Sequence, residues 1–192
     1  MFEDMYPDAK LKPIYTNEYD EVDMLMRGKI CLAITSRDFT PRQLKYLQDN
    51  DFQPTSIKLA YDGLALIVNK NNNDTCISVK DVKRILSGEV TEWNQIYPGS
   101  KWGKIKIVFD NPKSSTVKFC EDSILGGHGI SSVNASAVKT SQGVIDFVEK
   151  TPNAIGVIGS NWLNDKRDTT NCTFKKNIHV MSVSKMDKAT EM

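Results

Sequence analysis

The residues with the clearest chemical potential form the run Asp110-Asn111-Pro112-Lys113-Ser114-Ser115-Thr116. A β-type stretch, residues 105–109, precedes this run, and a helix-type stretch, residues 117–124, follows it. At such a helix start, unpaired N–H groups and the positive end of the helix dipole converge and favour an anion. The last three residues of the run add three hydroxyl groups at the same place. They also fit an ordinary Ser/Thr N-cap, so the case for an anion site depends on the rest of the chain.

Composition excludes several classes of function. The chain has 192 residues, of which 40% are hydrophobic and 26% charged, which is typical of a globular protein with one domain or two small lobes. A formal net charge of +1 argues against nucleic acid as the main partner. No apolar run approaches the roughly 18 to 20 residues of a membrane helix. We expect no metal site, because no CxxC pair is present among Cys31, Cys76, Cys120 and Cys172.

Expected strands and helices alternate along most of the chain, which predicts an α/β fold with largely parallel sheets. The expected strands or extended segments are residues 11–16, 29–35, 53–60, 64–69, 104–109, 154–158 and 178–184. The expected helices are residues 18–26, 41–50, 78–87, 114–125 and 142–150. In such sheets, ligands bind beyond the carboxyl ends of strands. Two polar turns have that position, Ser36-Arg37 and the run that begins at Asp110, and together they would form an anion clamp.

Four stretches in order resemble the periplasmic phosphate-binding proteins, which are the substrate-capture components of phosphate ABC transporters. They are residues 28–37, 61–69, 79–93 and 143–157. The third contains the family's SGxxxxW turn, which ends at Trp93, and the fourth contains its AIG-type strand. Each stretch alone is a weak signal, but the ordered set is specific to the superfamily. The resemblance implies a type II periplasmic-binding-protein fold, with two lobes whose mostly parallel central sheets are joined by crossover strands.

The resemblance also implies an organisation and a function. Residues 1–66 with 177–192 would form an incomplete lobe one, and residues 67–176 lobe two, with parts of lobe one expected before Met1 and after Met192. The implied function is extracytoplasmic or periplasmic capture of inorganic phosphate or a related oxyanion. A monomer without a cofactor or a catalytic residue would deliver the anion to an ABC transporter permease. A lipid anchor on a segment before Met1 is one way to hold it at the membrane.

The family's binding residues map unevenly onto this sequence. Its Ser-Gly-Thr motif falls on Ser114-Ser115-Thr116, its upstream arginine on Asp110, and its serine-plus-acid turn on Ser36-Arg37. The acid and the arginine are thus exchanged between the lobes. Arg37 would supply a forked cation that matches an oxyanion, and Asp110 would pair with Arg37 or accept a proton from hydrogen phosphate. Alternatively, both are unrelated surface charges. Asp62, near the expected hinge, is either a further binding residue or an ordinary turn acid.

One stretch argues against phosphate. Where the family has a serine-rich turn, this chain has Asn17-Glu18-Tyr19-Asp20. Acidic groups suit a helix N-terminus but repel a bound dianion. One alternative is that these acids point away from the ligand as helix caps. If instead they face the cleft implied between the two lobes, the ligand is another molecule, or the pocket is degenerate and the chain is a sensor or scaffold domain with a protein partner. An enzyme such as a phosphatase is disfavoured, because the sequence indicates neither a metal cluster nor an activated nucleophile.

Overall fold

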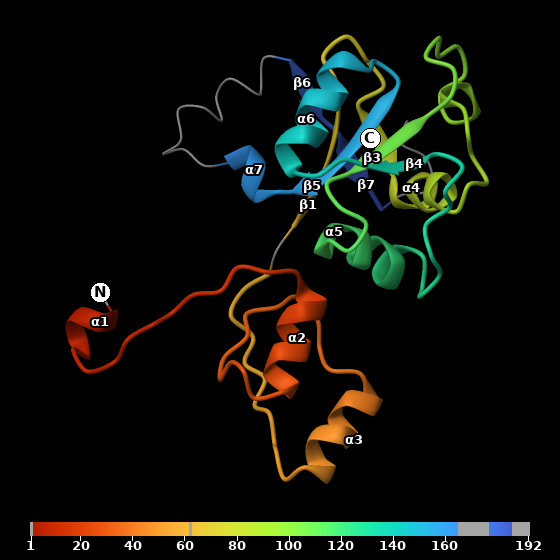
Figure 1. The fold of residues 1–192 in the computed structure, drawn as a ribbon. Helices are drawn as coiled ribbons and strands as arrows, with labels where there is room; N and C mark the ends of the chain where they lie inside the picture. The colour runs from red at the N-terminus through yellow and green to blue at the C-terminus, as the bar shows by residue number, and fades with distance from the viewer. Residues whose placement is uncertain (1, 62, 165–176, 186–192) are drawn as a thin grey trace. The chain divides into compact units, whose positions relative to one another are not determined.

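The computed structural model describes residues 2–61, 63–164 and 177–185 (Figure 1). The chain divides into two compact units, Met1–Ile57 and Lys58–Met192, here called the N-terminal and the C-terminal unit. The lobe boundaries implied by the family resemblance, residues 1–66 with 177–192 against 67–176, stay a prediction.

A mixed five-stranded sheet forms the centre of the C-terminal unit, with the strand order β4-β3-β5-β1-β6. Strand β5 is parallel to β3 and antiparallel to β1, while β4 runs parallel to β3 and β6 antiparallel to β1. A second small sheet pairs β2 and β7 in parallel. The strands are β1 (Leu64–Asn69), β2 (Cys76–Ser78), β3 (Lys106–Phe109), β4 (Ala135–Ala137), β5 (Ala154–Gly159), β6 (Ile178–Val180) and β7 (Ser182–Ser184).

The helices of this unit begin where the sequence supplies capping side chains. Ser78 caps α4 by accepting a hydrogen bond from the Asp81 N–H at 3.0 Å, and Thr140 caps α6 through the Gly143 N–H at 3.0 Å. The helical segments are α4 (Val79–Leu86), the 3-10 turn η1 (Trp93–Gln95), α5 (Ser115–Phe119), the π-helical turn η2 (Cys120–Ile124), α6 (Ser141–Lys150) and α7 (Asn161–Asn164).

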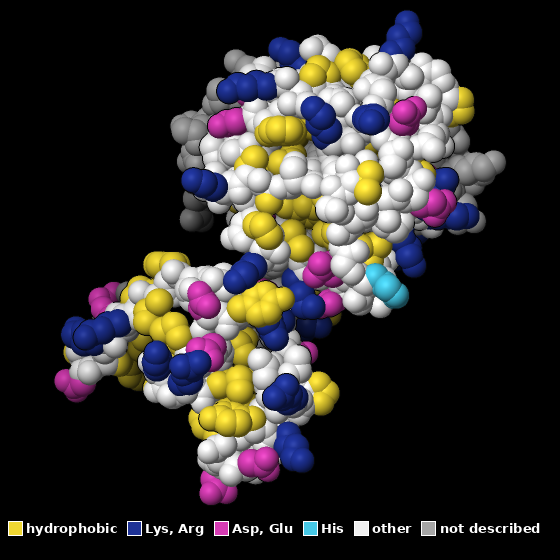
Figure 2. Space-filling view, turned by 45° about the vertical axis from the view of Figure 1, so that its right-hand side comes forward, with side chains coloured by type: hydrophobic (Ala, Val, Ile, Leu, Met, Phe, Trp, Pro, Cys, Tyr) yellow, Lys and Arg dark blue, Asp and Glu magenta, His cyan; other side chains and the backbone are white. Residues whose placement is uncertain are grey.

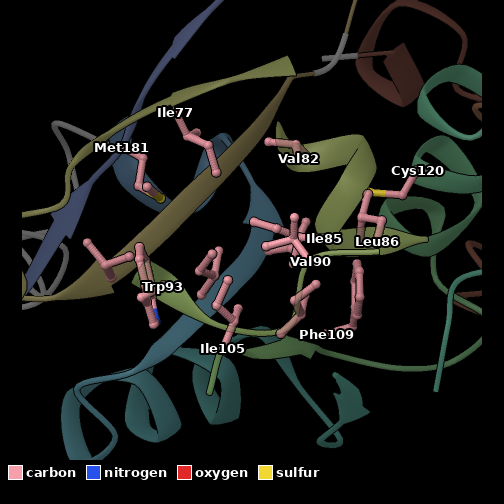
Figure 3. Packing of buried hydrophobic residues seen from close by; sticks show 14 of the residues in the cluster. Ile77, Val82, Ile85, Leu86, Val90, Trp93, Ile105, Phe109, Cys120 and Met181 are labelled. Carbon is pink, nitrogen blue, oxygen red and sulfur yellow. The ribbon is translucent and has the colours of Figure 1, made fainter. Parts of the chain in front are cut away.

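Both faces of the sheet are buried, because alternate side chains of each strand point to opposite faces. Ile107 and Phe109 of β3 belong to a cluster that includes the apolar side of α4, while Val108 between them packs with α6. The C-terminal unit is therefore a three-layer α/β/α arrangement, and the α/β prediction is confirmed. Figure 3 shows the cluster on the α4 side, with Ile77, Val82, Ile85, Leu86, Val90, Trp93, Ile105, Phe109, Cys120 and Met181 labelled.

The N-terminal unit is smaller and contains α1 (Phe2–Met5), α2 (Glu18–Met26) and α3 (Pro41–Asp49). The start of α3 has a capping box, in which Thr40 and Gln43 exchange hydrogen bonds. Its fully buried hydrophobic side chains, among the described residues, are Val22 and Leu47.

The expected strands at residues 11–16, 29–35 and 53–60 are wrong, since the structure assigns no strand there. A strand requires a partner for its backbone N–H and C=O groups, and residues 30–33 have no such partner within the part of the chain that the structure describes. Leu32 and Ile34 are 75% and 71% exposed, and Figure 2 shows hydrophobic side chains at the surface of this unit. The apolar run at residues 29–35 predicted buried side chains, but Leu32 and Ile34 of this run lie at the surface of the N-terminal unit.

Replacing Gly156 should destabilise the C-terminal unit. A Cβ at this position in β5 would lie 2.8 Å from side-chain atoms of Ile67, Val144 and Val148, whose branched Cβ atoms restrict their movement. We expect Gly156→Ala to lower the free energy of unfolding by about 1–3 kcal/mol. Denaturation followed by tryptophan fluorescence measures this, and Gly129→Ala, which would make an ordinary contact, is the control. Equal midpoints for the two variants would contradict the prediction.

Candidate functional site

The turn after β3 brings three predicted binding residues into one hydrogen-bond network. Asp110 follows the last residue of β3, and its Oδ1 accepts hydrogen bonds from the Asn111 N–H at 2.9 Å and from the Thr116 hydroxyl at 3.2 Å. The hydroxyl oxygens of Ser114 and Thr116 are 2.8 Å apart. Thr116 is buried, whereas Asp110 and Ser114 are half-buried. The predicted grouping of these three side chains at the carboxyl end of a strand is present in the structure.

The direction of these hydrogen bonds follows from proton counting. The Thr116 hydroxyl carries one proton, which it donates to Asp110, so Ser114 donates to Thr116. Ser114 also accepts from the Val117 N–H at 3.4 Å as the N-cap of α5. Both hydroxyl protons are therefore used inside the turn, and the ordinary capping interpretation of Ser114 holds.

Ser115 and the backbone beside it supply the donors that remain. The Ser115 side chain is exposed, and its hydroxyl has no hydrogen-bond partner in the described part of the chain. The backbone N–H groups of Ser115 and Thr116 likewise have no partner among the described residues. These three donors lie in the first turn of a helical run that continues through η2, where an incoming anion also meets the positive end of the peptide dipoles.

The Ser36-Arg37 turn lies in the N-terminal unit, where α2 holds it. One oxygen of Glu18, Oε1, accepts hydrogen bonds from the Ser36 N–H at 3.1 Å and from the Ser36 hydroxyl at 2.5 Å. Glu21, one turn further along α2, accepts from the Ile34 N–H at 2.7 Å. Two carboxylates of α2 thus fix the backbone of this turn. This contact cannot be predicted from the sequence, because Glu18 and Ser36 are 18 residues apart and no local pattern links them.

Arg37 is half-exposed and stacks on an aromatic ring. Its Cζ lies 4.9 Å from the centroid of the Tyr19 ring, a cation–π contact. No carboxylate pairs with Arg37 among the residues that the structure describes. The N–H edges of the guanidinium therefore stay available for a forked contact with an oxyanion. Its predicted relation to Asp110, which belongs to the other unit, stays a prediction.

The two acids at the start of α2 have different roles. Asp20 joins the helix cap, since its Oδ2 accepts from the Asn17 side-chain amide at 2.7 Å while Asn17 Oδ1 accepts from the Tyr19 and Asp20 N–H groups. Glu18 instead binds the Ser36 turn. Asp20 is thus a capping acid, as one of the two alternatives from the sequence proposed, and Glu18 is not.

Other candidate groups add little to the site. Asp62 lies outside the described residues. Within the described residues, no cluster of His, Cys, Asp or Glu could hold a metal ion, and no helix has the length and hydrophobicity to span a membrane. A pocket of about 250 Å³ beside the turn is lined mainly by apolar side chains, including Phe109, Val117 and Ile130, and so offers an anion little.

Comparison with known proteins identifies the family. A family model described as a PBP superfamily domain matches residues 1–191. The chain belongs to the PBP superfamily. The phosphate-binding protein PstS of Staphylococcus haemolyticus is 27% identical over 166 residues, which cover 85% of this chain and 51% of that protein. PstS of Staphylococcus aureus (strain USA300) is 26% identical over 85% of this chain and 49% of its own length. The chain therefore spans about half the length of these curated relatives.

Solved structures of PBP superfamily members confirm the fold. A Clostridium perfringens protein, described as a phosphate ABC transporter substrate-binding protein and solved with bound phosphate, has a TM-score of 0.70 at 21% identity, covering 97% of this chain and 69% of that one. An ABC-type phosphate transport receptor from Vibrio cholerae has a TM-score of 0.69 at 21% identity, covering 99% and 71%. The fold predicted from the sequence, that of a type II periplasmic binding protein, is confirmed.

Cys120, in η2 directly after α5, should be chemically inert in the folded protein. Burial, with a smaller contribution from the charge of Glu121, raises the pKa of the Cys120 thiol to about 12. The thiolate is the reactive form, so we expect Cys120 to resist Ellman's reagent at pH 8 until the protein is unfolded. The measurement uses a variant in which Cys31, Cys76 and Cys172 are replaced by serine.

The same shift predicts a pH dependence of stability. The pKa of Cys120 is higher in the folded than in the unfolded chain. The contribution of Cys120 to the free energy of unfolding is therefore fully present below the unfolded pKa of roughly 8.5, and it is lost as the pH rises toward about 12. Rapid labelling of native Cys120 at pH 8 would show that the thiol is accessible and would contradict both expectations.

Proposed function

We propose that this chain is the substrate-binding part of an ABC-type importer and captures phosphate or a similar oxyanion. The observation that carries the proposal is the turn after β3, where the Ser115 hydroxyl and two free N–H groups converge at a helix start. The names of the relatives support phosphate as the ligand, because the staphylococcal proteins are phosphate-binding proteins. No bond of the ligand changes in this function, which requires neither a nucleophile nor a metal.

Each unit contributes different donors to the proposed function. The C-terminal unit offers neutral N–H and O–H groups of Ser115 and Thr116, and the N-terminal unit offers the charged fork of Arg37. Capture of the anion in an interlobe cleft that closes about a hinge, as the family resemblance implies, is the mechanism that we propose. Delivery to a membrane permease, a location outside the cytoplasmic membrane and a monomeric state belong to the same proposal.

Arg37→Ala should weaken phosphate binding strongly. Charge-assisted hydrogen bonds from a guanidinium contribute about 1.5–3 kcal/mol, so we expect the dissociation constant to rise by about tenfold or more. Isothermal titration calorimetry with phosphate and sulfate measures this. Arg27→Ala is the matched control, since Arg27 lies in the same unit but pairs with Asp23 at 2.9 Å. An unchanged affinity in Arg37→Ala would exclude the clamp, and no heat from wild type with any anion would instead favour a sensor or scaffold domain.

A proline at position 115 tests the backbone donors directly. Proline is favoured at the first position of a helix and removes one N–H there, and Ser114 already has the extended ψ of 160° that a following proline requires. We expect Ser115→Pro to keep the thermal stability of the protein and to weaken phosphate binding more than Ser115→Ala, which removes only the hydroxyl. Equal affinities of wild type and Ser115→Pro, measured by calorimetry, would show that this turn does not bind the anion.

A further inference from the structure

We infer that Glu18 is a built-in competitor for the anion at the Ser36-Arg37 turn, so that ligand binding requires its carboxylate to release Ser36. This inference rests on the proposed function. It concerns contacts within the N-terminal unit alone.

The geometry at Ser36 is that of an oxyanion held by two donors. A single carboxylate oxygen, Glu18 Oε1, receives both the N–H and the O–H of one residue, at 3.1 Å and 2.5 Å. Hydrogen bonds to an ionised oxygen are stronger than those between neutral groups, and the O–H bond here is also short. The Ser36 hydroxyl has one proton, so while Glu18 holds it, Ser36 has no donor left for a second anion.

The charge of Glu18 acts in the same direction as its contacts. The Glu18 carboxylate is bound to Ser36, the residue directly before Arg37, and Arg37 is the cation expected to attract the ligand. A phosphate that approached Arg37 would meet this negative charge, and two anions at one site repel each other. Glu18 therefore lowers the affinity of the turn both by occupying its donors and by its charge.

The surroundings of the Glu18–Ser36 contact also allow it to break. Glu18 is half-buried and Ser36 is exposed, so water can hydrate the carboxylate once Ser36 is released. Glu18 is the first residue of α2, where the helix dipole stabilises a negative charge whether or not Ser36 is bound. A ligand with more charge and more acceptor oxygens than a carboxylate can displace it, and phosphate has both.

Glu21 provides a matched control on the same helix. Its carboxylate also holds the 34–37 backbone, through the Ile34 N–H at 2.7 Å, but it does not bind Ser36. Removing Glu21 therefore loosens the same segment by one hydrogen bond while leaving the Ser36 donors occupied. If Glu18 competes with the anion, its removal should raise the affinity for phosphate, and removal of Glu21 should not.

The test is calorimetric titration of inorganic phosphate into wild type, Glu18→Ala, Glu21→Ala, Ser36→Ala and the double variant Glu18→Ala/Ser36→Ala. We expect Glu18→Ala to bind phosphate about tenfold more tightly than wild type, as loss of one competing charged contact predicts. Glu21→Ala should show no gain, and the gain from Glu18→Ala should largely disappear when Ser36 is absent. Glu18→Gln, which keeps the shape but removes the charge, should give an intermediate gain and replaces Glu18→Ala if that variant does not fold.

The outcomes separate this inference from the proposed function. If wild type binds phosphate and Glu18→Ala binds it equally or more weakly, Glu18 positions Ser36 and the inference is wrong, while the proposed function stands. Binding by Glu18→Ala but not by wild type supports the inference in its strongest form. If neither wild type nor any variant binds phosphate, the proposed function fails and the inference falls with it.

Discussion

The pairing of β5 with β3 on one side and with β1 on the other is the interaction on which the C-terminal unit depends. It joins segments about 50 and 90 residues apart in the sequence into one sheet, and α4 and α6 then cover the two faces. Gly156 at the centre of β5 allows the side chains of α6 to approach the backbone closely. Asp110 and the turn that follows it therefore begin at the end of a strand that is paired on both sides, with β4 and β5.

A common feature of the two polar turns is that an internal carboxylate accepts the hydroxyl protons. Asp110 accepts from Thr116, and Glu18 accepts from Ser36. In both cases the carboxylate fixes the turn and removes hydroxyl donors that a ligand would otherwise use. The hydroxyls that look most like ligands in the sequence are thus partly structural. Donors without a partner among the described residues are the Ser115 hydroxyl, the backbone N–H groups of Ser115 and Thr116, and the guanidinium of Arg37.

Membership of the PBP superfamily shows the fold, whereas the binding function depends on individual residues. The exchange of acid and arginine between the two turns, which the family resemblance implies, stays a prediction. The structure adds that Arg37 is stacked on Tyr19 and free of ion pairs with the described residues, and that Asp110 is held by its own turn. This distribution is compatible with the proposed oxyanion ligand, whose affinity we infer to depend on how readily Glu18 releases Ser36.

The sequence by itself determined the elements whose signals are local. Helical spacing of apolar residues with Gly28 after them predicted α2, and Pro41 at a helix start predicted α3. The alternation of apolar segments predicted β1, β3 and β5. The apolar run 29–35 was predicted as a strand wrongly, because hydrophobicity indicates a tendency to be buried, whereas a strand needs a neighbour with free N–H and C=O groups. Tertiary structure alone decided that Glu18 holds Ser36 and that Tyr19 lies under Arg37. Such contacts join side chains far apart along the chain, and their geometry depends on how α2 packs against the turn, which no local pattern of residues encodes.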